Sequence, residues 1–282
     1  MQEEFEFRIL EEHAHRLFSS DEGKRGILAR TIKISGNDPR FPLIGDIDRE
    51  FKQRRNGSFF YGWSVCRNYS AEEIASAELF HLIVNSSAYF EPAGEDCGTV
   101  YDEDLSCSIC SAGGSQNGPL YLDINRIPRR KDIAKTIAGE VVVSQRLVDL
   151  LVERCVTGIA FHPVRRRRTT DIRPTGWHQL DVLPPNAEIV QPTRVGITPF
   201  DDDLDGEYRC TMGDTIGFNL LSEITISAAS RGEKDVVATR QFIGHRAGVL
   251  RPEKSILASP KVRQIFEENK IKGCRFEIAH LA

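Results

Sequence analysis

The residues with the clearest chemistry are the cysteines at positions 107 and 110. They form a Cys-x-x-Cys pair that is followed by Ser111. Two thiolates on one tight turn can bind the same tetrahedral zinc ion. Cys97, ten residues upstream, is a candidate third ligand; Cys210 is the best candidate for the fourth, and Cys66 is the next. The pair is half of a complete four-cysteine motif, so Cys107 and Cys110 as ordinary reduced thiols are the alternative.

A second distinctive group is acidic. Five of seven consecutive positions carry a carboxylate: Asp201, Asp202, Asp203, Asp205 and Glu207. The start of this segment matches the opening of a calcium-binding loop, but Met212 stands where an EF-hand needs a bidentate acid. A solvated loop is therefore the simpler interpretation. Because like charges repel, we also expect these five side chains to form a contact surface for a basic protein partner.

Other candidate residues suggest no chemistry. Residues 165–168 are four consecutive arginines, but no aromatic residue interrupts them and the chain has a net charge of −4. A solvated linker is the favoured interpretation of this run. Glu140, Ser144 and Ser222 are not accompanied by a Gly-x-Ser-x-Gly elbow or a phosphate-binding glycine loop. The sequence therefore contains no complete catalytic motif.

The elements that would position these residues follow a pattern that occurs twice. Each copy has a serine at a helix N-cap, apolar residues on one helix face, and a glycine turn before a short strand. The matched positions, 115 residues apart, are Ser144, Leu147, Leu150, Leu151 and Gly158 against Ser259, Val262, Ile265, Phe266 and Gly273. Cys107 and Cys210 differ by 103 positions, as do Asp132 and Asp235. We therefore expect a duplication, with a twelve-residue insertion in the second copy.

The pattern predicts an α+β protein in which an internally duplicated helix-turn-strand module packs with a mixed or antiparallel sheet, plus an N-terminal strand-rich region. The expected divisions are an N-terminal region (1–92), a first module with the Cys-x-x-Cys pair (93–164), a linker and strand (165–204) and a second module (205–282).

Local patterns predict elements of the N-terminal region. Alternating apolar residues predict strands at 5–9, 27–34 and 59–65. The composition of residues 37–42 predicts a loop. A capping box at residues 70–73 predicts a helix that continues through Leu82.

Composition limits the class of protein. The chain has 282 residues, 40% of them apolar, and a sequence pI of about 6.0. These values suit a folded protein whose main partner is not nucleic acid. No apolar run is long enough to span a bilayer, and the acidic start is unlike a signal peptide. We expect a cytoplasmic protein with reduced thiols, since seven cysteines are an odd number.

Several segments resemble the double-CXXCG proteins of myxobacteria and related bacteria. The resemblance rests on the pair at 107–110 and on residues 136–147 and 158–164. Residues 208–210, 217–223 and 277–281 add to it. Proteins of this family are largely uncharacterised, and some are associated with toxin–immunity cassettes. The present chain departs from the family pattern in having one Cys-x-x-Cys rather than two, and Ser111 in place of the following glycine.

The resemblance and the lack of a catalytic motif lead to a functional expectation. We expect a cytoplasmic immunity-type protein, not an enzyme, that binds and neutralises a cognate bacterial toxin by occluding it. The alternative is a zinc-supported nucleic-acid-binding or regulatory module that uses the arginine run. An enzyme of unrecognised type is a third possibility.

Overall fold

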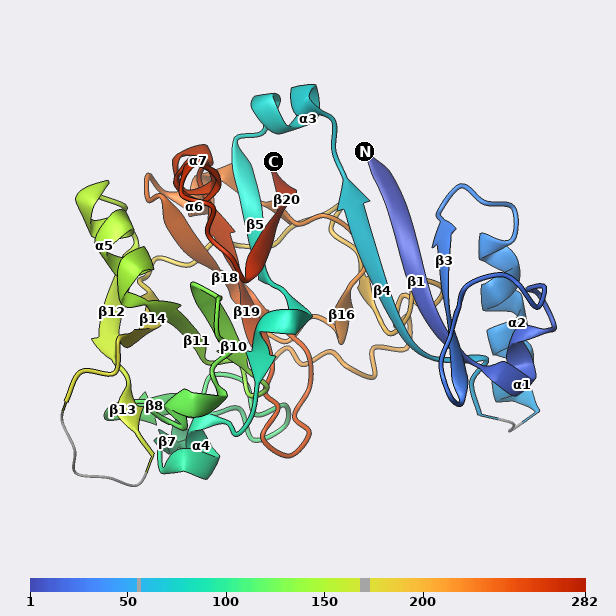
Figure 1. Ribbon diagram of the computed structural model, residues 1–282, viewed down its shortest axis with the longest axis horizontal. Helices are drawn as coiled ribbons and strands as arrows, with labels where there is room; N and C mark the ends of the chain where they lie inside the picture. Colours follow the sequence, from blue (N-terminus) through green and yellow to red (C-terminus); the bar gives the residue numbers. More distant parts are fainter. Residues whose placement is uncertain (55–56, 168–172) are drawn as a thin grey trace. The chain divides into compact units, whose positions relative to one another are not determined.

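The computed structural model describes residues 1–54, 57–167 and 173–282. The protein is mixed α/β and rich in strands (Figure 1). It divides into two compact units: Met1–Ser76 with Thr198–Asp201, and Ala77–Ile197 with Asp202–Ala282. The α and β content agrees with the expected class. Residues 77–92, expected in the N-terminal region, belong to the second unit.

The first unit is a four-stranded antiparallel sheet in the order β2-β3-β1-β4. Its strands are β1 (Gln2–Leu10), β2 (Lys24–Arg25), β3 (Ala29–Ser35) and β4 (Phe60–Asn68), and its described helices are α1 (Glu11–Ala14), α2 (Phe41–Gln53) and α3 (Ala71–Ser76). Alternate residues of β1 face the core, among them Phe5, Phe7 and Ile9. The three predicted N-terminal strands are thus confirmed.

Helix α2 was not predicted. The helix begins at Phe41, within the segment expected to be a loop. Pro42 occupies its first turn, a position that proline tolerates. The ring of Phe200 lies 4.9 Å from that of Phe41. A Cβ on Gly45 would come within 2.6 Å of Phe200, so glycine lets this ring pack against the helix.

The predicted helix after Ser70 is shorter than expected. The capping box is present: the Glu73 carboxylate accepts from the Ser70 N–H (2.8 Å), and Ser70 Oγ accepts from the Glu73 N–H (3.1 Å). However, α3 (Ala71–Ser76) ends there, and Leu79–Val84 forms strand β5 of the second unit. The expectation of a helix through Leu82 was wrong, because a short apolar run suits a buried strand equally well.

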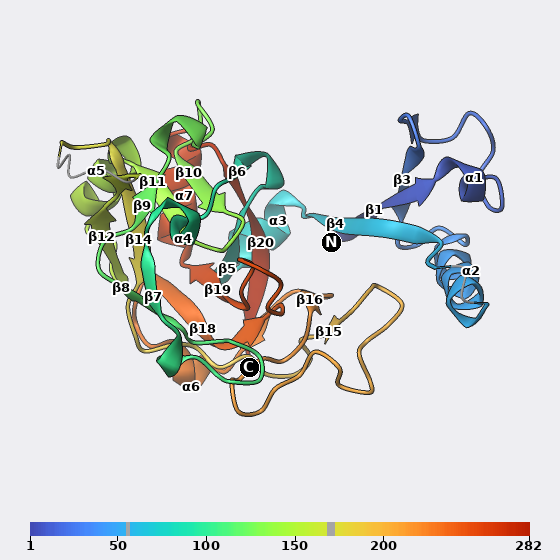
Figure 2. The ribbon, with the colours of Figure 1, turned by 90° about the horizontal axis from the view of Figure 1, so that it is seen from below.

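The second unit contains two five-stranded sheets, in the orders β12-β14-β11-β10-β6 and β17-β20-β5-β19-β18 (Figures 1 and 2). The first sheet is built from β6 (Tyr89–Phe90), β10 (Ile133–Thr136), β11 (Val141–Ser144), β12 (Ile159–Pro163) and β14 (Trp177–Val182). The second is built from β5, β17 (Thr225–Ile226), β18 (Val236–Ile243), β19 (Glu253–Ala258) and β20 (Cys274–Leu281). Side chains from both sheets meet in one core, including Leu82 and Val142.

Two helices cover this core, α5 (Gln145–Glu153) and α7 (Pro260–Glu268), and they contact each other. Ser144 caps α5 as predicted, its Oγ accepting from the Leu147 N–H at 3.3 Å. Ser259 occupies the N-cap of α7, but its hydroxyl donates to Asp235 instead. The remaining elements are short: α4 (Gly94–Cys97), α6 (Ala228–Arg231), β7 (Val100–Asp102), β8 (Ser115–Asn117), β9 (Tyr121–Leu122), β13 (Arg165–Arg166), β15 (Val195–Gly196) and β16 (Asn219–Leu220).

No helix among the described residues is both long enough and apolar enough to cross a lipid bilayer.

A pair of aspartates makes equivalent contacts just before β10 and β18. Asp132 accepts from the N–H of Lys272 (3.0 Å), and Asp235 accepts from the N–H of Thr157 (2.9 Å). The Asp132 carboxylate therefore holds the turn before β20, in the second segment (205–282). The Asp235 carboxylate holds the turn before β12, in the first segment (93–164).

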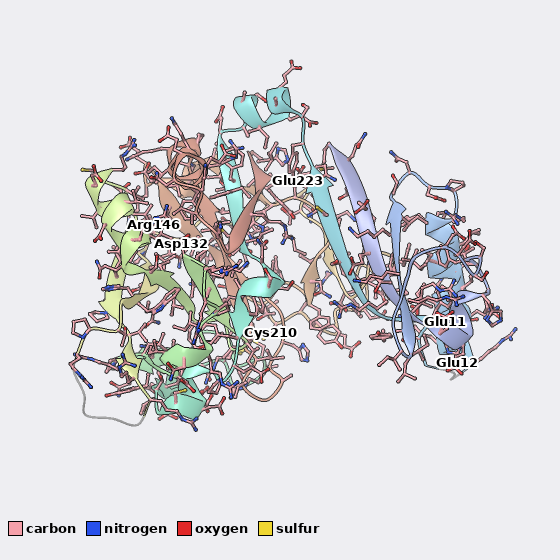
Figure 3. The ribbon with its side chains drawn as sticks, in the orientation of Figure 1. Glu11, Glu12, Asp132, Arg146, Cys210 and Glu223 are labelled. Atoms are coloured by element: carbon pink, nitrogen blue, oxygen red, sulfur yellow. The ribbon has the colours of Figure 1, made fainter. Side chains whose placement is uncertain are left out.

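The same aspartates also contact their own helices. Asp132 lies 3.4 Å from Ser144 Oγ and accepts from Arg146 at 2.9 Å (Figure 3). Asp235 accepts from Ser259 Oγ at 3.1 Å and from Lys261 at 3.0 Å. Each aspartate thus connects a strand, a helix start and a turn of the opposite segment.

Two glycines make the close approach possible. Gly158 and Gly273 have φ angles of 91° and 121°, in the region that glycine favours. A Cβ at either would lie 2.0 Å from a carbonyl oxygen, that of Val236 or of Ile133. The predicted turn glycines are therefore required where the two segments cross.

We expect Asp235→Ala to lower the free energy of unfolding by about 2 kcal/mol, since it leaves the Thr157 N–H without an acceptor. Burial opposes ionisation of Asp235, but hydrogen bonds from Thr157 and Lys261 outweigh it and lower its pKa. The contribution is therefore complete above the pKa of an unfolded aspartate, about 3.9, and is lost as the pH falls through the folded-state value. Urea unfolding between pH 7 and pH 3 measures both effects.

The exposed Asp149 on α5 provides the control for this experiment. Asp149→Ala should change stability by about 0.5 kcal/mol or less. Equal losses in the two variants would contradict the role assigned to Asp235.

Candidate metal centre

Three thiols come together in the second unit. The Sγ atoms of Cys107, Cys110 and Cys210 all lie within 4.8 Å of one another, and those of Cys107 and Cys210 are 3.7 Å apart. In a tetrahedral zinc site, Zn–S bonds of about 2.3 Å place neighbouring sulfurs about 3.8 Å apart. The three thiols can therefore hold one metal ion with little movement.

The first turn has the hydrogen bonds of a thiolate-binding loop. The N–H of Cys107 donates to the carbonyl of Ala112, and the N–H of Ser111 donates to the carbonyl of Cys107, both at 2.8 Å. The N–H groups of Cys110 and Ile109 point at Cys107 Sγ and lower the pKa of this thiol to about 7. Ser111 adopts a left-handed conformation (φ 57°), which glycine favours. The turn thus stabilises Cys107 as a thiolate, the form that binds metals.

The second turn, residues 210–215, has the same form. The N–H of Cys210 donates to the carbonyl of Thr215 (2.7 Å), and Asp214 is left-handed (φ 54°). Gly213 stands three positions after Cys210, as Cys110 stands three positions after Cys107. A Cβ built on Gly213 would lie 2.3 Å from Cys110 Sγ. The backbone of Gly213 therefore faces the thiols directly.

Sequence reasoning did not identify this Cys-x-x-Gly turn. The offset of 103 residues that relates Cys107 to Cys210 also relates Cys110 to Gly213, so the signal was present. It was missed because a glycine carries no ligand atom.

Thr215 links the second turn to the first. Its hydroxyl is buried and donates to Cys110 Sγ at 3.2 Å. Burial raises the pKa of Cys110, and the Thr215 hydrogen bond opposes this effect. Cys107, whose pKa its turn lowers, therefore ionises before Cys110.

Cys97, expected as the third ligand, does not belong to the group. It ends helix α4, which packs against β9, and its side chain is fully buried. Burial raises the pKa of this thiol, while a backbone hydrogen bond at Asp123 opposes the effect. Cys210, not Cys97, is the third thiol of the group.

A cavity of about 790 Å³ borders the second turn. Cys210, Asp214 and Thr215 contribute to its wall, together with the arginines at positions 194, 209 and 240. Solvent molecules and small solutes can therefore reach the second turn beside Cys210.

The acidic segment is not the exposed surface that was expected. Asp203 is buried, and its carboxylate accepts from the N–H groups of Glu207 (2.8 Å) and Tyr208 (3.2 Å). Asp202 pairs with Arg194 at 2.6 Å. Asp203 was wrongly expected to face a partner, because its carboxylate organises the loop that leads into Cys210.

The other members of the segment divide between the units. Asp201 belongs to the first unit, where its backbone pairs with Thr198. Asp205 and Glu207 are exposed in the second unit. Only these two retain the expected exposure.

The arginine run and Glu140, two other candidates from the sequence, make contacts that stabilise the fold. Arg165 and Arg166 form strand β13, which pairs with β9, and both are half-buried. Arg168 lies outside the described residues. The buried carboxylate of Glu140, whose pKa burial raises, accepts from the N–H of Gly94 and the hydroxyl of Tyr101. Both of these bonds are to Oε1, while Oε2 accepts from the hydroxyl of Thr136, so the carboxylate is occupied by structural contacts.

Compared with protein-family models and with curated proteins, the chain matches no family model and no curated sequence. The resemblance to double-CXXCG proteins therefore stays a prediction.

The thiols should differ sharply in reactivity. In protein treated with a chelator, we expect Cys107 to be alkylated with a half-maximal rate near pH 7, the pKa its turn imposes. Cys274, whose pKa burial raises to about 12, should be alkylated only after unfolding. Iodoacetamide labelling followed by peptide mass spectrometry gives both rates. The rate at the exposed Cys66 serves as an internal reference, and labelling of Cys107 that rises only above pH 9 would contradict the expectation.

Proposed function

We propose that the protein is a zinc-supported binding protein of the immunity type, which binds a cognate bacterial toxin and occludes it. The observation that carries the metal part is the meeting of three thiols from two turns that are 103 residues apart. Zinc is the ion proposed because thiolate ligands at this spacing suit its tetrahedral geometry.

The position of the turns supports a structural role for the ion. Each turn belongs to a long connection with short elements, such as β7, β8 and β16. Such connections bury little apolar surface of their own, so a bound ion would contribute directly to their stability. The ion would also hold the tips of the two turns rigid.

The turn tips support a role in binding a protein. Ile109 and Met212 occupy matching positions, two residues after Cys107 and Cys210, and they are 70% and 78% exposed. Large apolar side chains held rigid on a surface are typical of protein interfaces. With the exposed Asp205 and Glu207, they form the surface that we propose contacts the toxin; we call it the turn-tip surface.

We further propose that the second unit arose by internal duplication. The supporting observations are the matching contacts of Asp132 and Asp235 and the two turns of the same form. The proposal expects Asp132→Ala and Asp235→Ala to destabilise the protein by similar amounts.

Protein purified without a chelator should contain about one equivalent of zinc. Removal of this zinc with a chelator should lower the melting temperature by several degrees, since the ion ties two long connections. The Cys210→Ser variant should contain little zinc and show no chelator effect. Elemental analysis and calorimetry measure these changes.

Cys97→Ser and Cys66→Ser are the matched controls. Both remove a thiol outside the group of three, and both should retain zinc. If the wild-type protein contains no zinc and takes up none, the proposal of a zinc centre is wrong.

The toxin-binding proposal can be tested with the product of a neighbouring toxin-like gene. Co-expression should suppress toxicity, and the two proteins should purify as a complex. Ile109→Glu should weaken the complex at least tenfold, since it replaces an exposed apolar side chain of the turn-tip surface by a charge. Ile27→Glu is the matched control, because Ile27 is equally apolar and 99% exposed but lies in the first unit. Unchanged toxicity without a complex would refute the immunity function, and nanomolar binding to random DNA would favour the nucleic-acid alternative.

A further inference from the structure

We infer that the metal centre has an open fourth coordination position, which takes an exogenous thiolate. This inference rests on the proposed zinc centre and concerns its coordination. A closed structural zinc site has four protein ligands, whereas a site with three protein ligands keeps one position for water or another molecule. The protein supplies three thiols here.

The two turns identify the open position. Cys107 and Cys210 each donate from their backbone N–H to the carbonyl five residues later. Each turn also has a left-handed residue four positions after its first cysteine, Ser111 in one turn and Asp214 in the other. This correspondence places Gly213 where the first turn has Cys110. Gly213 faces Cys107 Sγ as well, at 3.1 Å from an added Cβ. The residue at the fourth corner therefore has no side chain to contribute.

Neighbouring side chains do not fill this corner. Among the described residues, the group contains Cys107, Cys110 and Cys210 alone. The Thr215 hydroxyl donates to Cys110 Sγ. The His245 ring packs against the rings of Tyr208 and Phe218, with centroids at 5.4 and 4.7 Å.

The surroundings favour a small thiol. Three soft thiolate ligands select a metal ion that prefers a fourth soft ligand. The cavity of about 790 Å³ that Cys210, Asp214 and Thr215 border lets a small ligand approach the second turn. Its arginines at positions 194, 209 and 240 each pair with a carboxylate, so the cavity is not lined by positive charge alone. An exogenous thiolate would thus complete the tetrahedron and leave again without unfolding the turns.

Cobalt(II) provides the test, because its absorption reports the number of thiolate ligands. The apoprotein is refilled with one equivalent of cobalt(II) and titrated with 2-mercaptoethanol. The sulfur-to-cobalt charge-transfer absorption should rise by about one third as a fourth thiolate adds to three. A saturable rise at one thiol per cobalt supports the open position.

Two variants sharpen the result. In Gly213→Cys the new Cβ would lie 2.3 Å from Cys110 Sγ, so the Cys110 side chain must shift to admit it. The variant should then show the four-thiolate spectrum without added thiol and should not respond to the titration. Met212→Cys is the matched control: it adds a thiol to the same turn at its exposed tip, and it should respond as the wild-type protein does. If the Gly213→Cys protein does not fold, the titration of the wild-type protein alone decides whether the fourth position is open.

The outcomes separate the two proposals. If the wild-type protein binds neither cobalt nor zinc, the proposed metal centre is wrong, and the open position falls with it. If it binds one equivalent and its spectrum does not respond to added thiol, the metal centre stands and the open position is wrong.

Discussion

The second unit depends on an exchange of hydrogen bonds between two chain segments. Asp132 and Asp235 each stabilise a helix start of their own segment and a turn of the other. The exchange holds the two five-stranded sheets against one core. Each cysteine turn lies 25 residues before its aspartate, Cys107 before Asp132 and Cys210 before Asp235. Because the aspartates fix where these two connections end, they help to determine where the two turns can meet.

Much of this arrangement was accessible from the sequence. Capping serines, turn glycines and the helix faces depend on local rules, and the structure places Ser144, Gly158 and Gly273 as those rules require. Strand β5 was not accessible, since a run such as Leu79–Val84 is assigned by the neighbours that pair with it, here β19 and β20. These neighbours lie some 170 residues or more downstream.

The candidate site shows a different limit. Ligand type could be predicted from the sequence, but the set of ligands depends on which loops meet. Cys97 is nearer to Cys107 along the chain than Cys210 is, yet a four-residue helix turns it into the core. The acidic segment shows the same limit for charge. Composition predicts five solvated carboxylates, whereas backbone N–H groups near Asp203 provide a substitute for water and allow that carboxylate to be buried.

The order of the strands has a consequence for how the chain folds during synthesis. Strand β5 lies in the centre of its sheet, between β19 (Glu253–Ala258) and β20 (Cys274–Leu281). On the ribosome, β5 emerges long before either neighbour, with both edges unpaired and all its side chains apolar except His81. Such a strand is prone to pair with other chains until its neighbours arrive. This topology therefore makes the growing chain a natural client of chaperones that cover apolar strands, and the interval of risk ends only when residue 281 has left the ribosome.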